Sequence, residues 1–372
     1  MHKKTDFINQ QPRRKRRGIK PSARIKMPAF YNSGIFLYIY PMKLTINEIA
    51  DMAHVAKSTV SKAINGQKGV SEENRRRILK IIQEVNFQPN ASARALAQNK
   101  SGSIGLILPH RSVFTLSGQY WAGIISSIAD EANRRGNSLS VISTQGETDL
   151  PVSTLERILR QHSIDGLIIG AEQINTKEII SVLQEELPFV FLGRNRLLEH
   201  YSVDVDNVQG AYKLTKSLIA QNKKNIGCIT GPIEYDYTRQ RLNGFVQAMG
   251  EENLDAGKTV NCQYEAKEIY KKTCNLIEEN PQIDALFLTA GEEFVLEVLD
   301  AVKTVKGDTK NFIFAAFDDS HIYDYLNCKI ISARQPLENL GKTAAGMLFD
   351  LISGKEIPHP NQCLNVEIIN HN

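Results

Sequence analysis

Residues 45–66, with the sequence TINEIADMAHVAKSTVSKAING, place the strongest constraint on how this chain can fold. Thr45 and Glu48 have capping-box spacing and precede apolar residues at helical spacing, which predicts a helix beginning near Ile46. The stretch from 52 to 57 is too short for anything except a turn, and a second amphipathic segment follows it. Two helices joined by a tight turn form a helix-turn-helix, a unit that places its second helix in the major groove of duplex DNA.

The predicted second helix has one apolar face and one polar face. The polar face holds short or cationic donors, which suit base edges and phosphates. They are Lys57, Ser58, Ser61 and Lys62. Ser71 is expected to cap a third helix, whose apolar residues complete a three-helix core. Those apolar residues are Ile78, Leu79, Ile82 and Val85. An amphipathic helical hairpin packed inside a larger domain is the alternative explanation of the same pattern.

From residue 44 to its C-terminus the chain resembles the LacI/GalR family of bacterial transcription regulators. The resemblance lies in TINEIADMAHVAKSTVSKAING, VSEENRRRILKIIQEVNFQPNASARALA, GPIEYDYTRQRLNGF and FDDSHIYDYLNCKIISARQPLENLGKTAAGML. It implies an all-α helix-turn-helix head followed by an α/β two-lobed, periplasmic-binding-protein-like effector domain. It also implies a homodimeric repressor of a near-palindromic DNA operator. Its operator affinity would change when a small-molecule effector, expected to be a sugar or a sugar derivative, binds between the lobes.

The resemblance also assigns DNA-binding residues by position. They are Thr45, Lys57, Ser58, Thr59, Ser61, Lys62, Asn65, Asn90, Arg94 and Leu96. Lys57, Ser58 and Lys62 take the base-reading positions of the recognition helix, and the other residues before the hinge take positions that contact the DNA backbone. The family's hinge motif falls on residues 89–97, where Leu96 is expected to insert between base pairs in the minor groove. An ordinary buried leucine is the alternative role for Leu96.

The chain is basic at its N-terminal end and acidic over its larger C-terminal part. Residues 1–41 contain ten Lys and Arg and one acidic residue, and residues 42–101 contain ten and five. Residues 102–372 contain twenty-five Lys and Arg and thirty-five acidic residues, so the formal net charge of +4 hides a strong asymmetry. The positive charge lies where neutralisation of DNA phosphates would be needed. For the basic residues of the third predicted helix, phosphate contact and a solvated face both remain open. Those residues are Arg75, Arg76, Arg77 and Lys80.

The first forty-one residues precede the pattern shared with the family. They contain the basic run PRRKRRGIKPSARIK, which is expected to be disordered. Met42 is the expected natural start, and the upstream segment is then a misassigned extension; a nonspecific DNA-binding arm and a nuclear localisation signal are the alternatives. The predicted organisation is an extension over 1–41, a helix-turn-helix domain over 42–88, a hinge helix and linker over 89–101, and an effector-binding and dimerisation domain over 102–372.

Neither export nor membrane insertion is indicated by the sequence. The apolar patch at 35–40 is too short to span a bilayer, and the apolar core of a cleavable signal peptide is missing from the N-terminus, so a cytoplasmic protein is expected. The five cysteines are scattered and odd in number. They predict neither a disulfide framework nor a metal cluster, and no cofactor is expected.

From Ser103 onward the chain alternates short apolar runs with amphipathic segments. The apolar runs are SIGLILP, SLSVIST, DGLIIG and PFVFLG, and then NIGCITG, DALFLT and NFIFAAF. Such alternation is typical of parallel strands joined by helices. Two halves of about 130 residues each fit two α/β lobes better than one oversized sheet. In the family the lobes are joined by crossing strands and close over an effector near the carboxyl ends of the strands.

Candidate effector-binding residues follow from the same positional matches. They are Gln119, Tyr120, Arg194, Tyr237, Arg241, Tyr264 and Asp318. Arg241 and Asp318 take ligand-gripping positions, and an Arg with an Asp in one cleft supplies the donors and acceptors that a polyol requires. A surface ion pair or a helix cap remains the alternative for the charged residues, and simple packing remains the alternative for the tyrosines.

One departure from the family pattern affects ligand specificity. Relatives commonly have an Asn-Asp pair after the strand that corresponds to DALFLT, whereas this chain has Gly291 and Glu292. A hydrogen-bonding group of sugar-responsive relatives is therefore expected to be missing, which leaves the ligand class open.

Enzymatic and transport functions are the competing classes. Gly341, Lys342 and Thr343 resemble the end of a phosphate-binding loop, but Pro336 stands where the first glycine of that motif is required. The apolar spacing around them predicts a helix instead. No metal-ligand spacing of histidines and no nucleophile elbow occurs. A sugar-binding transport component would need an export signal and would leave the helix-turn-helix unexplained, so a ligand-responsive regulator is the expected function.

Overall fold

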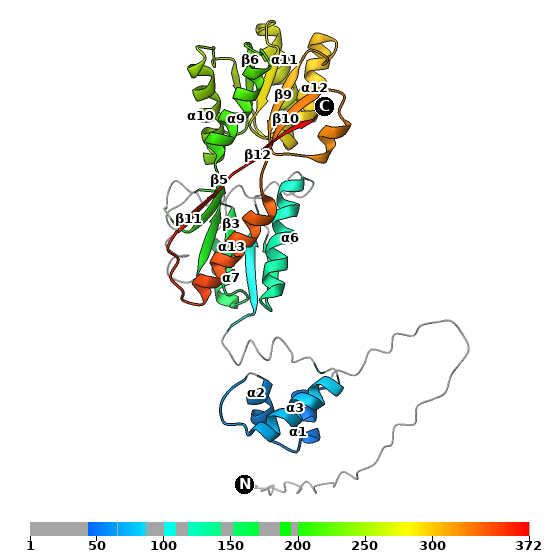
Figure 1. Ribbon diagram of the computed structural model, residues 1–372, viewed down its shortest axis with the longest axis vertical. Coiled ribbons are helices and arrows are strands. Elements are labelled where there is room, and N and C mark those ends of the chain that lie inside the picture. The colour runs from blue at the N-terminus through cyan, green and yellow to red at the C-terminus, as the bar shows by residue number, and fades with distance from the viewer. Residues whose placement is uncertain are drawn as a thin grey trace, which may run out of the picture. The chain divides into compact units, whose positions relative to one another are not determined.

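The computed structural model describes residues 44–64, 66–85, 87, 100–108, 118–142, 152–170, 187–194 and 200–371. The chain forms two compact units, residues 1–88 and residues 89–372 (Figure 1). The predicted extension over 1–41 lies outside the described residues, and so does the predicted hinge apart from residues 100 and 101.

In its described residues, the first unit is a bundle of three helices, as the sequence predicts. They are α1 (Ile46–Met52), α2 (Lys57–Ile64) and α3 (Glu72–Glu84). The capping box that begins α1 is present, because the Glu48 carboxylate accepts from the Thr45 backbone N–H at 2.6 Å and the Thr45 hydroxyl accepts from the Glu48 N–H at 3.4 Å. Ser71 caps α3 by accepting from the Asn74 N–H at 3.3 Å. Both local capping predictions are confirmed.

The core of this bundle corrects one residue of the prediction. Ile49, Val60 and Ile78 are fully buried at its centre. Leu79 is instead 45 % exposed, and Ile81 packs against the core in its place. Because neighbouring helical residues point in directions about 100° apart, Leu79 cannot share a narrow buried stripe with Ile78.

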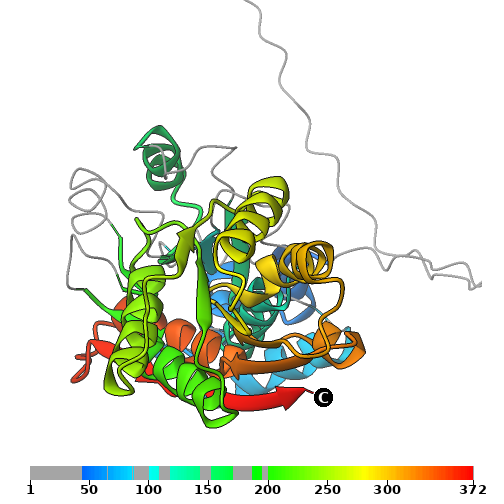
Figure 2. The same cartoon turned by 90° about the horizontal axis from the view of Figure 1, so that it is seen from above.

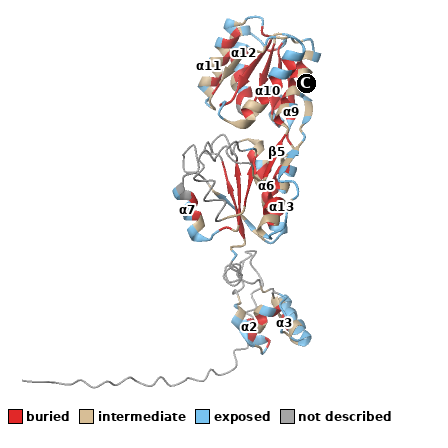
Figure 3. Ribbon diagram, turned by 90° about the vertical axis from the view of Figure 1, so that its left-hand side faces the viewer, coloured by how far each residue is buried: buried red, intermediate tan, exposed pale blue. Residues whose placement is uncertain are grey.

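The second unit contains two mainly parallel six-stranded sheets, each the centre of one lobe. The first has the order β11-β5-β4-β3-β1-β2. Its strands are β1 (Ser103–Ile107), β2 (Ser138–Ile142), β3 (Leu167–Gly170), β4 (Phe189–Leu192), β5 (Ser202–Val205) and β11 (Asn361–Leu364). Helices α6 (Gln119–Arg134) and α13 (Leu337–Ile352) lie on one face of this sheet, and α7 (Val152–Gln161) lies on the other (Figure 3).

The second lobe repeats this arrangement. Its sheet has the order β12-β10-β9-β8-β6-β7, with only β12 antiparallel to its neighbour. The strands are β6 (Ile226–Thr230), β7 (Thr259–Asn261), β8 (Ala285–Leu288), β9 (Ile313–Phe317), β10 (Lys329–Arg334) and β12 (Glu367–His371). Helices α9 (Asn207–Ala220) and α10 (Asp236–Glu251) pack together, as do α11 (Ala266–Glu279) and α12 (Gly291–Lys306). Figure 2 shows β12, in red, at the edge of this lobe.

The chain crosses between the lobes three times, as the family resemblance implies, so the lobes are not simply the two consecutive halves of the strand rhythm. It crosses from β5 to α9, from β10 to α13, and from β11 to β12. Helix α13 returns to the first lobe because its apolar stripe, which includes Leu340, Ala344 and Leu348, is buried there against α6. This also confirms that residues 341–343 belong to a helix.

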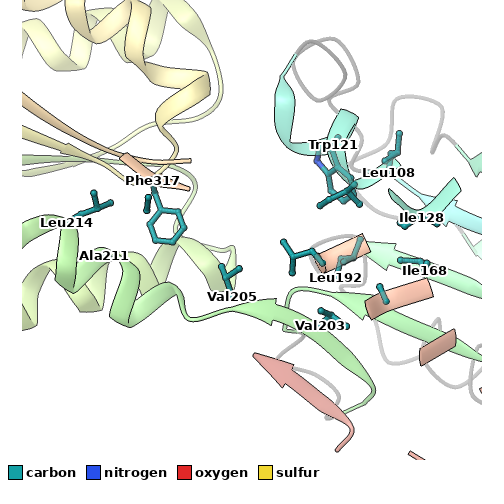
Figure 4. Packing of buried hydrophobic residues seen from close by; sticks show 14 of the residues in the cluster. Leu108, Trp121, Ile128, Ile168, Leu192, Val203, Val205, Ala211, Leu214 and Phe317 are labelled. Carbon is teal, nitrogen blue, oxygen red and sulfur yellow. The ribbon is translucent and has the colours of Figure 1, made fainter. Parts of the chain in front are cut away.

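The buried apolar residues at the crossings join the two lobes into one hydrophobic cluster. Val205 at the end of β5 lies between Leu192 of the first lobe and Phe317 of the second (Figure 4). Within the described residues, no helix combines the length and the apolar character needed to cross a bilayer.

Candidate functional site

The recognition helix predicted in the first unit presents its polar residues to solvent. Lys57, Ser58 and Lys62 are exposed on α2, whereas Val60 and Ala63 are buried on the opposite face. This separation arises because apolar residues three positions apart share one side of a helix. The three side chains that the sequence assigned to base reading are therefore accessible to solvent on one face of α2.

Of the other predicted DNA-binding residues, three lie in the part of the chain that the structure describes. Thr59 and Ser61 are partly exposed on α2, and Thr45 is exposed while its hydroxyl takes part in the capping box of α1. The other four lie outside the described residues: Asn65, Asn90, Arg94 and Leu96.

Arg75 has a role that the sequence did not reveal. Its guanidinium donates to the Ala63 carbonyl at 3.2 Å and to the Gln67 carbonyl at 2.6 Å. These carbonyls lie in the last turn of α2 and just beyond it, where helix carbonyls lack partners within the helix. Arg75 therefore stabilises the end of the recognition helix, a third possibility beside phosphate contact and a solvated face.

A cavity of about 100 Å³ lies between the two lobes of the second unit. Five of the seven predicted effector-binding residues line it: Tyr120, Tyr237, Arg241, Tyr264 and Asp318. Six further residues complete the lining: Trp121, Leu192, Gly193, Asp204, Ala290 and Gln335. The other two predicted residues do not line the cavity. Arg194 is exposed next to Gly193, and the backbone of Gln119 binds Glu292.

Several neighbouring groups hold the Arg241 side chain at the cavity. Its Nε donates to Asn207 Oδ1 at 2.9 Å and its Nη1 donates to the Thr289 carbonyl at 2.6 Å. The guanidinium carbon lies 3.7 Å from the centroid of the Phe317 ring, a cation–π distance. Nη1 also lies 3.4 Å from Asp318 Oδ2, and the two side chains are 7 % and 14 % exposed. These contacts therefore fix the orientation of the Arg241 guanidinium at the cavity wall.

Asp318 is positioned by an unusual backbone and by two neighbours. It directly follows β9 with a φ of +77°, in the left-handed region that non-glycine residues rarely occupy. Its carbonyl accepts from the Tyr323 hydroxyl at 3.3 Å, and its Oδ1 accepts from Gln335 Nε2. Gln335 lies at the crossing between β10 and α13 and is buried. Strained residues of this kind cluster at ligand sites.

Asp204 is a second buried carboxylate at the crossings. Burial raises its pKa to about 6, against hydrogen bonds from the Val205 N–H at 2.7 Å and from Asn207 Nδ2 at 3.2 Å and the nearby charge of Arg241. Because Asn207 also accepts from Arg241, it connects Asp204 to the Arg241–Asp318 pair. Asp204 was not among the residues predicted from the sequence; the alternation of polar and apolar residues in SVDVDN is the signal that could have indicated it.

Aromatic side chains form much of the remaining wall. Tyr120 and Trp121 contact each other edge to face with centroids 5.3 Å apart. Tyr237 and Tyr264 share a hydrogen bond between their hydroxyls, and Arg241 lies 5.0 Å above the Tyr237 ring. A small cavity with aromatic faces and a few oriented polar groups is the usual form of a small-molecule site.

The departure at residues 291 and 292 also has a structural explanation. A Cβ at Gly291 would lie 2.5 Å from the Ala316 Cβ and 2.7 Å from the Phe317 carbonyl, so a side chain does not fit there. The Glu292 carboxylate is not part of the cavity lining; it accepts hydrogen bonds from the backbone of Gln119 instead.

Both units of the chain match models of known protein families. Residues 45–90 match the bacterial regulatory proteins of the lacI family, and residues 101–367 match the periplasmic binding proteins and sugar binding domain of the LacI family. The repressor PurR of Aliivibrio salmonicida is 25 % identical over 84 % of this chain and 93 % of its own length. The regulator MalR of Streptococcus pneumoniae is 29 % identical over 67 % of this chain and 76 % of its own.

Solved structures show the same fold. The lac repressor dimer bound to operator and the anti-inducer ONPF has a TM-score of 0.72 at 21 % identity, covering 88 % of this chain and 97 % of that one. The transcriptional regulator CelR in complex with cellobiose has a TM-score of 0.64 at 21 % identity, covering 88 % and 98 %. The chain belongs to the LacI family of bacterial regulatory proteins and is a DNA-binding transcriptional regulator controlled by an effector, not an enzyme.

Proposed function

We propose that this protein is a cytoplasmic homodimeric repressor whose affinity for a near-palindromic operator is set by a carbohydrate bound between its lobes. The observation that carries the proposal is the meeting of Arg241 and Asp318 at a cavity with aromatic walls. Paired donors and acceptors suit vicinal hydroxyls, and aromatic faces suit the apolar face of a sugar ring. The cellobiose complex of CelR, which has the same fold, agrees with this ligand class.

The DNA-binding surface in this proposal is the polar face of α2. Lys57, Ser58 and Lys62 contact base edges, and Thr45, Thr59 and Ser61 contact the DNA backbone, together with Asn65. Asn90, Arg94 and Leu96 act from the hinge, where Leu96 inserts into the minor groove. Two such surfaces in a dimer read half-sites about one helical turn apart, a spacing set by the twofold symmetry of the protein.

Control by the effector follows from its position between lobes that are joined by three crossings. A ligand that contacts both lobes binds the closed arrangement more tightly than the open one, and it shifts the population by that difference. The shift moves the hinge segments of the dimer and changes operator affinity.

We assign the proposed regions as an extension over 1–41, the helix-turn-helix domain over 42–88, the hinge over 89–101 and the effector-binding domain over 102–372.

The test uses the full chain in two steps. Selection from random duplex DNA identifies a preferred operator, and thermal-shift screening against sugars, sugar phosphates and nucleosides identifies a ligand, because a bound ligand raises the melting temperature by mass action. Operator binding is then measured by fluorescence anisotropy with and without that ligand. A sugar that changes operator affinity is expected. Selection without a preferred sequence, or stabilisation only by nucleosides, would contradict the proposal.

A further inference from the structure

Glu292 joins the two lobes beside the cavity. It is the second residue of α12 in the second lobe, and its carboxylate oxygens lie 3.0 and 2.9 Å from the backbone nitrogen of Gln119. Gln119 is the first residue of α6 in the first lobe, 173 positions earlier in the chain. The Ser320 hydroxyl also donates to Glu292, at 3.3 Å. The carboxylate is therefore fixed by groups from both lobes.

This contact supplies the cap that α6 lacks within its own sequence. The N-cap residue is Gly118, and no side chain at that position caps the helix. The free N–H groups at a helix N-terminus favour an anion, and Glu292 is the anion at this one. A Cβ at residue 118 would lie 2.8 Å from Glu292 Oε2, so glycine is the residue that allows this approach.

The surroundings of Glu292 disfavour any additional negative charge. Burial and the charge of Asp318 raise the pKa of Glu292, against the hydrogen bond from Gln119. Asp204 and Asp318 both line the cavity. Among the described residues of that lining, Arg241 is the single basic side chain, and its Nη1 is already engaged by the Thr289 carbonyl and by Asp318.

We propose that Glu292 is a specificity-determining residue, which makes the cleft select uncharged effectors over phosphorylated or carboxylated ones. The proposal rests on the proposed function, since it takes the cleft to be the effector site. A phosphate is the group that an uncapped helix N-terminus beside the cleft would bind. Glu292 occupies that position with a carboxylate from the opposite lobe and repels a second anion from it.

The experiment measures binding of inorganic phosphate to the full chain by the fluorescence of Trp121. This residue is the one tryptophan of the chain, lies in the first turn of α6 and lines the cavity, so its emission reports on this site. The variants are Glu292→Ala, which frees the Gln119 N–H, and Glu292→Gln, which keeps an accepting oxygen without the charge. Asp300→Ala is the matched control, because Asp300 is an exposed acidic residue of the same helix.

The wild type and Asp300→Ala are expected to show no saturable response to phosphate. Glu292→Ala is expected to bind phosphate saturably, at least about tenfold more tightly than the weakest binding that the wild-type titration would detect, which corresponds to about 1.4 kcal/mol. Glu292→Gln is expected to fall between the two. Equal responses of the wild type and both Glu292 variants would overturn the proposal, as would saturable phosphate binding to the wild type. If circular dichroism shows that Glu292→Ala is unfolded, Glu292→Gln decides the outcome.

A second arm compares glucose with glucose 6-phosphate, and ribose with ribose 5-phosphate, in the wild type and in Glu292→Ala. The variant is expected to gain affinity for the phosphorylated member of each pair relative to the neutral one. An unchanged preference in the variant would overturn the role of Glu292. This result is independent of DNA binding, so a failure of the proposed operator function would be seen separately, in the anisotropy measurement.

Discussion

The guanidinium of Arg241 on α10 and the carboxylate of Asp318 after β9 meet at 3.4 Å at the edge of the interlobe cavity. Neither group is solvated like a surface charge, because their side chains are 7 % and 14 % exposed. Removing one partner of such a pair leaves an uncompensated buried charge, which costs more than loss of an exposed ion pair. A substitution of Arg241 or Asp318 is therefore expected to change both effector binding and the free energy of unfolding.

Arg241→Ala is expected to abolish the response of operator binding to the effector and to lower the free energy of unfolding by about 3 kcal/mol. The loss of stability follows because Asn207 and the Thr289 carbonyl also lose their donor. Operator affinity without effector is expected to stay close to that of the wild type. Anisotropy titrations and urea unfolding measure the two effects, with Arg239→Ala on the same helix as the control. A retained effector response would contradict the assignment.

Lys57→Ala is expected to weaken binding to the selected operator by about 1–3 kcal/mol without changing the melting temperature. The reason is that Lys57 is exposed at the first position of α2 and is not part of the buried core. Lys271→Ala is the control, since Lys271 is an exposed lysine of α11 in the effector domain, outside the helical head. If both variants bind the operator as the wild type does, α2 does not contact bases through Lys57.

Ser71→Ala is expected to destabilise the helical head by about 1 kcal/mol, because the Asn74 N–H at the start of α3 loses its acceptor. Ser58→Ala, an exposed serine of α2, is the matched control and should leave stability unchanged. Chemical unfolding of the full chain, followed by helical circular dichroism, measures both. Equal unfolding midpoints for the two variants would rule out the capping contribution.

Asp204 is expected to make the effector domain less stable as pH rises. Its pKa is 3.8 when unperturbed and about 6 in the fold, so the folded state binds the proton more tightly and loses stability as pH rises through this window. The difference amounts to at most about 3 kcal/mol above pH 6. Asp204→Asn keeps an accepting oxygen for the Val205 N–H and removes this dependence.

Unfolding midpoints of the wild type and Asp204→Asn are therefore expected to converge near pH 4 and to separate at pH 7, where the variant is the more stable. The wild type has to be compared with Asp204→Asn because the pKa of Glu292 is also raised. Glu292 therefore adds the same pH dependence of stability to both proteins. A wild type that is more stable than Asp204→Asn at pH 7 would contradict the effect of burial on Asp204.

The sequence by itself determined the features that depend on neighbours a few positions away. The Thr45–Glu48 capping box and the Ser71 cap join residues three positions apart, and both are present. The apolar runs predicted β1 to β4 of the first sheet and β6, β8 and β9 of the second, because a buried strand needs an apolar segment. The other described strands, β5, β7, β10, β11 and β12, were not among the predicted runs. Positional resemblance further predicted Tyr120, Tyr237, Arg241, Tyr264 and Asp318, which the fold brings to one cavity.

Only the tertiary structure decided the features that depend on distant partners. The return of α13 to the first lobe, the hydrogen bonds of Arg75 and the entry of Asp204 and Gln335 into the cavity all require neighbours from other elements. The contact between Glu292 and Gln119 spans 173 positions. Helical and strand periodicity describe which face of an element is buried, and they contain no information about which partner covers that face. The pairing of each buried face with its partner is set in the folded chain, where distant apolar surfaces are buried against one another.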